Sequence, residues 1–177
     1  AMIQYRALLE AELSPSLFDA FVRRQVVSQC WRKRGGVWRI EYDPFVDDWN
    51  KADYQALLSS LKRTLAGQGA VYGAFDGHLL KGFVSIEGTK LGSRAQYMDL
   101  SHLYVSQELR GRGIGARLFS LAKQFARGHE AEKLYLSAHS AVESQAFYRA
   151  MGCVEAEEYD PAHVKAEPYD CQLECRL

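Results

Sequence analysis

The residues best suited to chemistry lie in a glycine-rich turn, Arg110-Gly-Arg-Gly-Ile-Gly-Ala116, between a strand-like segment and a helix-like segment. Gly111, Gly113 and Gly115 lack a Cβ atom, so the backbone can turn tightly and a ligand can approach it closely. The N-terminus of the helix that follows would offer free N–H groups and a partial positive charge. The pattern therefore indicates an anion site, most naturally for phosphate.

The spacing of these residues excludes two common nucleotide motifs. A dinucleotide fingerprint requires a glycine three residues after Gly115, where this chain has Leu118. A P-loop requires Gly-Lys-Ser/Thr at its end, whereas Gly115 is followed by Ala116 and Arg117. The turn must therefore serve another kind of phosphate ligand.

The segment Arg110-Gly-Arg-Gly-Ile-Gly115 resembles the R/Q-x-x-G-x-G/A turn of the GNAT superfamily of N-acetyltransferases, which binds the pyrophosphate of acetyl-CoA. A second segment, Ser144–Gly152, is similar to the A-x-x-[LF]-Y-x-x-x-G-F segment of the same family, with Tyr148 at its tyrosine. The two segments and the strand before them cover residues 97–155. The resemblance implies a mixed α/β fold, with a mostly antiparallel central sheet flanked by helices.

The resemblance also implies acetyl-CoA as the co-substrate and no metal. Backbone N–H groups in the turn would hold the pyrophosphate, and the strand before it would pair with the pantetheine arm through Leu103 and Val105. The family often has an asparagine seven residues before the tyrosine, where this chain has Ala141; Ser140 or Ser144 would supply a hydroxyl instead. The predicted cofactor-binding residues are Leu103, Val105, Arg110, Gly111, Arg112, Gly113, Ile114, Gly115, Ala116 and Ser144.

Two residues are predicted to handle protons. Tyr148 matches the tyrosine that often protonates the departing thiolate in the family, although an aromatic side chain on a helix can also serve packing alone. Asp99 lies eleven residues before Arg110, where related histone acetyltransferases place a catalytic glutamate. Asp99 could act as a base, relay through water, bind the cation of the substrate or serve the structure. His102 is predicted on the opposite face of the strand, as a structural residue, and His139 is a weaker candidate.

The resemblance also implies that the segment between the first two predicted helices lines the acceptor pocket. Here this is the acidic and aromatic segment 42–50, where Tyr42, Asp43 and Trp49 would receive an amine; a solvated turn is the alternative. Acidic residues near this segment and the C-terminus favour a small cationic amine. They are Asp43, Asp47, Asp48, Glu155, Glu157, Glu158, Asp160, Glu167 and Asp170. A protein N-terminal or lysine acetyltransferase and a non-catalytic acetyl-CoA-binding module remain alternatives.

Length and composition set broad limits. The 177 residues suit one domain over 1–177, and 22 basic residues balance 22 acidic ones, so no global field indicates nucleic acid or an anionic membrane surface. The four cysteines form no C-x-x-C pair, and we expect reduced thiols in a cytoplasmic protein. A homodimer through the alternating C-terminal strand, residues 169–177, is a further expectation.

Hydrophobic periodicity predicts the elements that would position these residues. Strands are expected at 3–10, 37–42, 70–75, 79–86, 97–105 and 133–138, with two more between 153 and 177; helices are expected at 17–31, 52–66, 116–126 and 141–151. Residues 43–50 and 87–95 are expected to be loops. Simple alternation along 97–105 would place Asp99, Ser101, Leu103 and Val105 on one face.

Overall fold

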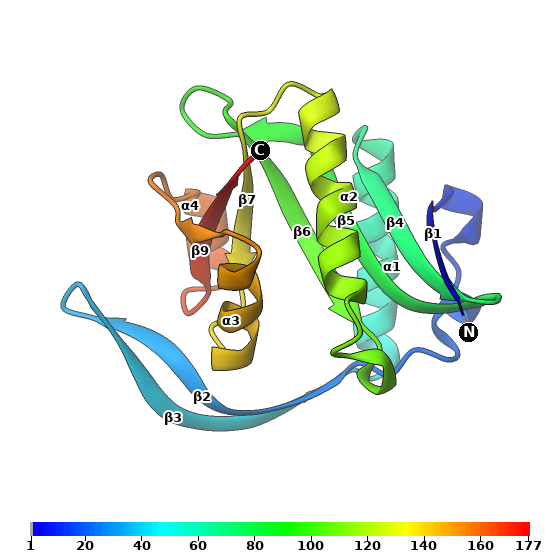
Figure 1. Ribbon diagram of the computed structural model, residues 1–177, viewed down its shortest axis with the longest axis horizontal. Coiled ribbons are helices and arrows are strands. Elements are labelled where there is room, and N and C mark those ends of the chain that lie inside the picture. The colour runs from blue at the N-terminus through cyan, green and yellow to red at the C-terminus, as the bar shows by residue number, and fades with distance from the viewer. Residues whose placement is uncertain (1) are drawn as a thin grey trace.

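The computed structural model describes residues 2–177 and is built around a seven-stranded sheet (Figure 1). Its strands, in spatial order, are β1 (Ile3–Ala7), β4 (Ala70–Asp76), β5 (Leu79–Leu91), β6 (Tyr97–Val105), β7 (Lys133–Ala138), β9 (Cys171–Arg176) and β8 (Val154–Glu155). Neighbouring strands are antiparallel, except for the parallel pair β6 and β7. The predicted mixed, mostly antiparallel sheet is confirmed.

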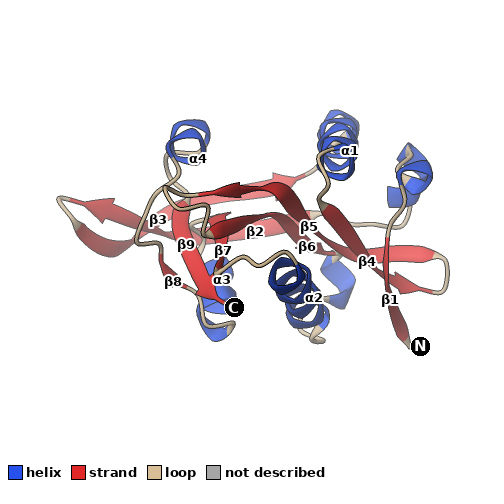
Figure 2. Ribbon diagram, turned by 90° about the horizontal axis from the view of Figure 1, so that it is seen from above, coloured by secondary structure: helices blue, strands red, loops and turns tan. Residues whose placement is uncertain are grey.

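Helices cover both faces of this sheet (Figure 2). Helices α2 (Ile114–Gly128) and α3 (Val142–Ala150) lie on one face, and α1 (Lys51–Ala66) and α4 (Pro161–Ala166) lie on the other. Leu118 and Ala122 of α2 are fully buried in one core layer, and Leu61 of α1 is fully buried in the other. The sheet therefore separates two apolar layers, and each strand presents one set of side chains to each layer.

Helix α1 forms where the periodicity predicts it. Its N-cap is Asn50, whose side chain accepts a hydrogen bond from the Asp53 N–H at 2.9 Å, while the Asp53 carboxylate accepts from the Asn50 N–H at 2.8 Å. This capping box satisfies N–H groups that the first helical turn leaves free. Buried Leu57, Leu58 and Leu61 then hold the helix against the sheet.

The helix predicted over residues 17–31 is wrong, because this segment forms the first strand of a long hairpin. A short 3₁₀ turn at Pro15–Phe18 precedes β2 (Arg24–Arg34), which pairs with β3 (Val37–Asp48). Gly35 and Gly36 have φ angles of +56° and +79°, the requirement of a two-residue type I′ turn. The glycine pair that suggested a helix end is therefore a hairpin turn, and the β-branched and aromatic residues of β2 favour a strand.

Several predicted boundaries near the ends of elements are also wrong. Strand β3 continues to Asp48, through part of the predicted loop 43–50, and β5 continues to Leu91. The first strand ends at Ala7. Between β8 and β9 the chain forms α4, whose N-cap Asp160 accepts a hydrogen bond from the His163 N–H and is followed by a proline, a helix-start signal that the sequence prediction missed.

A β-bulge in β6 changes which side chains share a face. His102 pairs with Ser85, but the next residue of β5, Ile86, pairs with Leu100, so Ser101 is an extra residue in the ladder. The regular alternation predicted for 97–105 is therefore interrupted at Ser101. The side chains before Ser101 and those after it therefore do not belong to a single alternating pattern along the strand.

Because of the bulge at Ser101, Asp99 and Val105 lie on opposite faces of the sheet. Leu103 and Val105 pack in the layer of α2, as does Leu100, whereas Tyr104 packs in the layer of α1. Asp99 contacts His163 of α4, on the α1 face. The predicted shared face of Asp99 and Val105 is therefore wrong.

Strand β9 does not provide a free face for a second copy. It pairs with β7 over Lys133–Ala138 and with β8 on its other edge, and its side chains from Cys171 to Cys175 are buried. The structure therefore shows no free apolar face on Cys171–Cys175, and a homodimer stays a prediction. All four cysteines are buried and unpaired. No helix within residues 2–177 has the length and apolar character to cross a membrane.

Candidate active site

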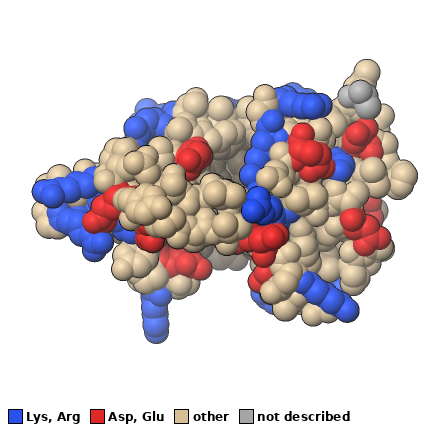
Figure 3. Space-filling model, turned by 90° about the horizontal axis from the view of Figure 1, so that it is seen from below, with Lys and Arg blue, Asp and Glu red and all other residues tan. Residues whose placement is uncertain are grey.

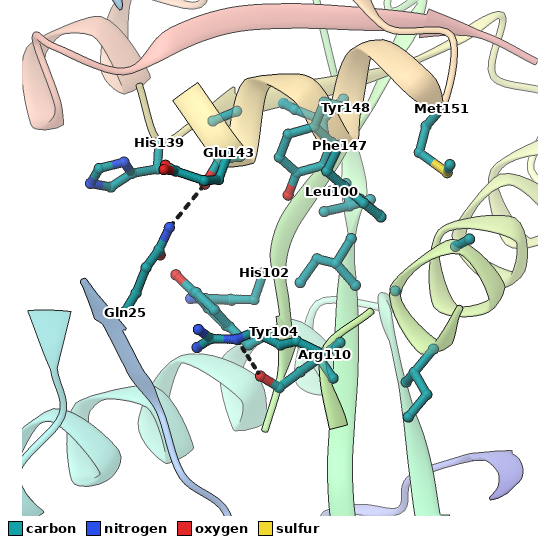
Figure 4. Close-up of a pocket in the computed structure, with 18 of the residues that line it drawn as sticks. Gln25, Leu100, His102, Tyr104, Arg110, His139, Glu143, Phe147, Tyr148 and Met151 are labelled. Atoms are coloured by element: carbon teal, nitrogen blue, oxygen red, sulfur yellow. Dashed lines mark hydrogen bonds between the residues drawn. The ribbon is translucent and has the colours of Figure 1, made fainter. Parts of the chain in front are cut away.

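A cavity of about 780 Å³ opens where β6 and β7 separate (Figure 4). The two strands pair only between Tyr97–Asp99 and Lys133–Tyr135, and beyond this point they diverge. Most of the predicted cofactor and catalytic residues line the cavity: Leu103, Val105, Arg110, Gly111, Gly113, Ile114, Gly115, Ala116, Ser144 and Tyr148. Arg112 is exposed and does not line it.

The free edge of β6 forms one wall. The Ser106 N–H donates to the Lys81 carbonyl at 2.7 Å, toward β5. Because successive residues of a strand direct their N–H and C=O groups to opposite sides, Leu103 and Val105 direct theirs away from β5, to the edge that β7 has left. Arg110 Nε donates to the Val105 carbonyl at 3.4 Å at this edge. The edge can pair with an extended polar chain.

The glycine turn forms the next wall, and its three glycines serve two purposes. Gly111 and Gly113 have φ angles of +79° and +81°, which L side chains rarely adopt, and both have open space where a Cβ would stand. A Cβ on Gly115 would lie 3.1 Å from the Phe147 ring, so this glycine allows α2 and α3 to approach each other. The first N–H groups of α2 therefore face the cavity with no side chain in the way.

A view of the end of the molecule that carries the hairpin shows the same arrangement from outside (Figure 3). A hollow opens near the middle of this face, and Lys and Arg side chains gather on its rim on the side of α2. Positive charge at the N-terminus of a helix favours an anionic ligand. The turn thus has the backbone and the electrostatics of a phosphate site.

Tyr148 enters the cavity from α3. Its ring packs against Phe147 and Phe119, with centroids 5.2 Å and 6.4 Å away, and its hydroxyl points into the open space (Figure 4). Burial raises the pKa of this hydroxyl above its usual value, so it keeps its proton at neutral pH. Tyr148 is therefore placed to donate a proton inside the cavity.

Asp99 does not line the cavity. Its Oδ2 is 2.7 Å from His163 Nε2, and its Oδ1 is buried without a hydrogen-bond partner. Burial raises the pKa of the Asp99 carboxyl, and the hydrogen bond to Asp99 raises the pKa of His163. The catalytic role of Asp99 stays a prediction, and in this arrangement Asp99 would act through another group and not by direct contact with an acceptor.

The three residues predicted to bind the acceptor do not reach the cavity. Tyr42 is 76% exposed on β3, and Asp43 is paired with Arg32 at 2.7 Å. Trp49 packs against the ring of Tyr104 at a centroid distance of 4.7 Å, behind the cavity wall. An acceptor in this cavity would therefore not contact Tyr42, Asp43 or Trp49.

The β2–β3 hairpin instead supplies cavity residues that the sequence prediction missed. Val22 is hydrogen-bonded to Ser106 and Gln107 at the end of β6, and the Trp31 N–H donates to the Ser140 carbonyl after β7 at 2.8 Å. The hairpin thus bridges the two separated strands (Figure 1). Arg23, directly before β2, and Gln25, Val26 and Asp47 of the hairpin line the cavity. A helix prediction for 17–31 could not reveal this, because no strand was expected there.

A buried arginine fixes this part of the wall. Arg23 is 5% exposed, its Nη2 pairs with Asp47 Oδ2 at 2.9 Å, and its guanidinium lies 4.6 Å from the centre of the Tyr104 ring. Much of the predicted acidic frame is also paired with basic residues of the same chain, mostly at the surface: Asp43 with Arg32, Asp48 with Arg24, Glu155 with Lys33 and Glu157 with Lys133. Glu143 remains without an ion pair at the cavity rim, within residues 2–177.

His139 lines the cavity, but its ring carries the proton on Nε2, so the nitrogen without a partner is a hydrogen-bond donor. Its Nδ1 accepts a hydrogen bond from the Ala141 N–H at 3.0 Å, so the proton of the neutral ring is on Nε2. Burial lowers the pKa of His139, which favours this neutral form. A ring whose only lone pair is engaged by a backbone N–H cannot accept a proton from a substrate.

Comparison with known proteins identifies the family. The acetyltransferase (GNAT) domain family matches residues 45–173, and the chain therefore belongs to the GNAT acetyltransferases. The predicted family is confirmed. No curated protein sequence matches the chain significantly.

Solved structures share the fold over the whole chain. Nourseothricin acetyltransferase has 18% identity and a TM-score of 0.68, covering 99% of each chain. A protein described as a streptothricin acetyltransferase from Bacillus anthracis, in complex with acetyl coenzyme A, has 16% identity and a TM-score of 0.71, covering 100% of this chain and 99% of its own. The PaiA N-acetyltransferase from Thermoplasma acidophilum, in complex with coenzyme A, has 16% identity and a TM-score of 0.62 over both full chains.

Proposed function

We propose that this protein transfers an acetyl group from acetyl-CoA directly to the primary amine of a small cationic molecule. One observation carries the proposal. The free edge of β6, the glycine turn and the hydroxyl of Tyr148 meet in a single cavity, and the β2–β3 hairpin crosses its far end.

The residues present fit acetyl-CoA. The turn has two left-handed glycines with open space at their Cβ positions, and the N-terminus of α2 supplies free N–H groups for the pyrophosphate. Leu103 and Val105 direct backbone groups to the edge where an extended pantetheine would lie. The solved structures above that hold acetyl-CoA or CoA have the same fold, which supports this ligand. When bound, acetyl-CoA supplies the acetyl thioester.

Tyr148 is proposed as the proton donor to the leaving thiolate. Its hydroxyl faces the cavity, and burial keeps it protonated at neutral pH. The Val105 N–H, on the same free edge, is proposed to polarise the thioester carbonyl. A hydrogen-bond donor held in a dry cavity stabilises developing negative charge more strongly than water does, because it needs no reorganisation during the reaction.

The hairpin favours a small acceptor over a protein. Hydrogen bonds link Val22, just before β2, to Ser106 and Gln107 after β6, and link Trp31 of β2 to Ser140 after β7, so the chain's own backbone closes the acceptor end of the cavity. The carboxylates of Asp47 and Glu143 line this end, and Glu143 has no ion-pair partner within residues 2–177. A carboxylate without a partner attracts an ammonium group, which supports a cationic amine.

A screen tests the proposal. The protein is incubated with acetyl-CoA and a panel of diamines, aminoglycosides, amino acids and lysine peptides, and free CoA thiol and N-acetyl products are measured. We expect product with one or more small cationic amines, and little with peptides. His78→Gln, in an exposed hairpin turn, serves as the unchanged control. Binding of acetyl-CoA without product from any amine would overturn the proposed activity, and product from peptides alone would overturn the acceptor class.

A further inference from the structure

His102 and His139 both line the cavity, and in each ring Nδ1 is hydrogen-bonded while Nε2 has no hydrogen-bond partner within residues 2–177. The bulge at Ser101 turns the His102 side chain to the α1 face of the sheet, where it lines the cavity beside Tyr104, with ring centroids 6.2 Å apart (Figure 4). Its Nδ1 is bonded to Ser85, and no bond to its Nε2 is found. The predicted position of His102 away from the cavity is therefore wrong.

Behind His102 lies a chain of short hydrogen bonds that leads to a carboxylate. His102 Nδ1 is 2.9 Å from Ser85 Oγ, which is 2.7 Å from Ser101 Oγ. Ser101 Oγ is in turn 2.5 Å from Glu87 Oε2. Thr64 of α1 also donates to Glu87 Oε2, at 2.7 Å. The chain runs from the cavity to Glu87, a partly exposed residue two positions after Ser85 on β5.

The carboxylate sets the direction of every bond in this chain. An ionised carboxylate only accepts, so Ser101 donates its single proton to Glu87. Ser85 must then donate to Ser101, and its oxygen is left to accept from His102 Nδ1. The neutral ring therefore carries its proton on Nδ1 and has a lone pair on Nε2, the reverse of His139. The extra residue of the bulge is what places Ser101 between Ser85 and Glu87.

We propose that His102 is the base that takes a proton from the attacking amine, and that Ser85, Ser101 and Glu87 position it and carry the proton away. This inference rests on the acetyl transfer proposed above. The ring is ready to accept, because burial lowers the pKa of His102 and keeps it neutral at pH 7, although Glu87 opposes this shift.

The protons balance. As the amine nitrogen forms its bond to the acetyl carbon, its N–H becomes acidic and passes a proton to His102 Nε2. The Nδ1 proton moves to Ser85, the Ser85 proton to Ser101 and the Ser101 proton to Glu87, which releases it to solvent. Between turnovers the ring loses its Nε2 proton to water and regains a proton on Nδ1 through the same chain, which restores the starting tautomer. The C–S bond breaks, and the thiolate takes its proton from Tyr148, which is later reprotonated by solvent.

The orientation of the ring can be measured without any substrate. Two-dimensional ¹H–¹⁵N NMR of the histidine side chains reports which ring nitrogen carries the proton, with His102→Gln used to assign the signals. We expect the Nδ1–H form for His102 in the wild type and the loss of its fixed tautomer in Ser101→Ala. An Nε2–H form in the wild type would overturn the proposal even if the enzyme is active.

Kinetics then test the catalytic role of His102. For the amine found in the screen, His102→Gln should lower kcat by about 100-fold or more, in the range of general base catalysis, with an unchanged KM for acetyl-CoA. Ser101→Ala should lower kcat by about tenfold, because the ring loses its orientation but not its lone pair. Ser59→Ala, on the exposed side of α1, is the matched control.

A pH profile separates this role from a structural one. The charged and titratable groups around His102 are Glu87 on β5, Tyr104 and Asp99 on β6, Arg23 and Asp47 on the hairpin, and His139 after β7. Because Glu87 raises the pKa of His102, Glu87→Gln should move the acidic limb of kcat/KM to lower pH. The proposal would be contradicted if His102→Gln kept the wild-type kcat. It would also be contradicted if the acidic limb of the kcat/KM profile did not move in Glu87→Gln. Loss of activity in Asp99→Asn together with wild-type activity in His102→Gln would overturn the proposal and place the proton path at Asp99 and His163.

Discussion

The donor side and the acceptor side of the cavity are built in different ways. The donor side is one continuous stretch, in which β6, the glycine turn and α2 follow each other from Tyr97 to Gly128. The acceptor side is assembled from the β2–β3 hairpin, the segment after β7 and a bulge in the middle of β6. A local arrangement can be inferred from residue spacing, whereas an assembled one depends on tertiary contacts that spacing does not record.

Substitutions on the donor side and on the acceptor side should therefore impair the use of different substrates. Changes in the turn should affect acetyl-CoA and leave the acceptor unchanged, and changes in the hairpin should do the reverse. Tyr148 lies between them, because it reaches from α3 into the space where the two substrates would meet.

Tyr148→Phe should give the largest effect, since it removes the proposed proton donor that serves both sides. We expect kcat to fall by about 100-fold or more, within the range of general acid catalysis, while the Kd for acetyl-CoA changes little. Steady-state kinetics and calorimetric titration measure the two quantities. Phe147→Leu, a neighbour without a hydroxyl, provides the comparison for lost packing, and an equal loss of kcat in that variant would remove the case for proton donation.

Gly113→Val should act on the donor side alone. A β-branched residue at φ +81° costs about 1–3 kcal/mol, so the turn will distort and the KM for acetyl-CoA should rise by about tenfold. The KM for the amine should stay within about twofold of its wild-type value. Gly128→Ala, where the backbone has no positive φ and a Cβ would meet nothing within 4 Å, is the matched control. Similar increases in both KM values would show that the donor and acceptor sides do not act independently.

Asp47→Asn should act on the acceptor side and on stability. It leaves the Arg23 guanidinium, 5% exposed, without its carboxylate, and because Asp47 itself is 34% exposed we expect a loss of about 1–2 kcal/mol, below the value for a fully buried pair. Urea unfolding measures it. The neighbouring pair of Arg24 and Asp48 is exposed and 4.0 Å long, so Asp48→Asn should cost less than about 0.5 kcal/mol. An unchanged KM for the amine in Asp47→Asn would place the acceptor elsewhere.

The pair of Asp99 and His163 should give a smaller effect, visible in the pH dependence of stability. Both pKa values are raised in the folded protein, that of His163 by its hydrogen bond to Asp99 and that of Asp99 by burial. The stability that His163 contributes is complete below its unfolded value of 6.5 and is lost as the pH rises through the folded value. The free energy of unfolding should therefore fall above pH 6.5, and His163→Gln should flatten this slope relative to His78→Gln.

The same difference between the donor and acceptor sides explains which parts of the fold and the site can be predicted from the sequence. The bounds of β6, the anion turn and the helix that carries Tyr148 follow from glycine spacing and apolar periodicity. The pattern over residues 17–31 does not distinguish a helix from a strand, because the apolar residues around and within β2 recur at steps of three and four, and Gly35-Gly36 suits either a helix end or a hairpin. The position of His102 on the cavity wall could not be inferred, because one extra residue in a ladder inverts the alternation of side chains and leaves no mark in composition.

The central claim is that both substrates occupy one cavity and react without an acetylated enzyme. Initial velocities measured over a grid of acetyl-CoA and amine concentrations test it most directly. The structure predicts lines that intersect in a double-reciprocal plot, because both substrates must be bound before transfer, and no label on the protein when labelled acetyl-CoA is added without amine. Parallel lines, together with an acetylated protein, would show a covalent intermediate and contradict the claim.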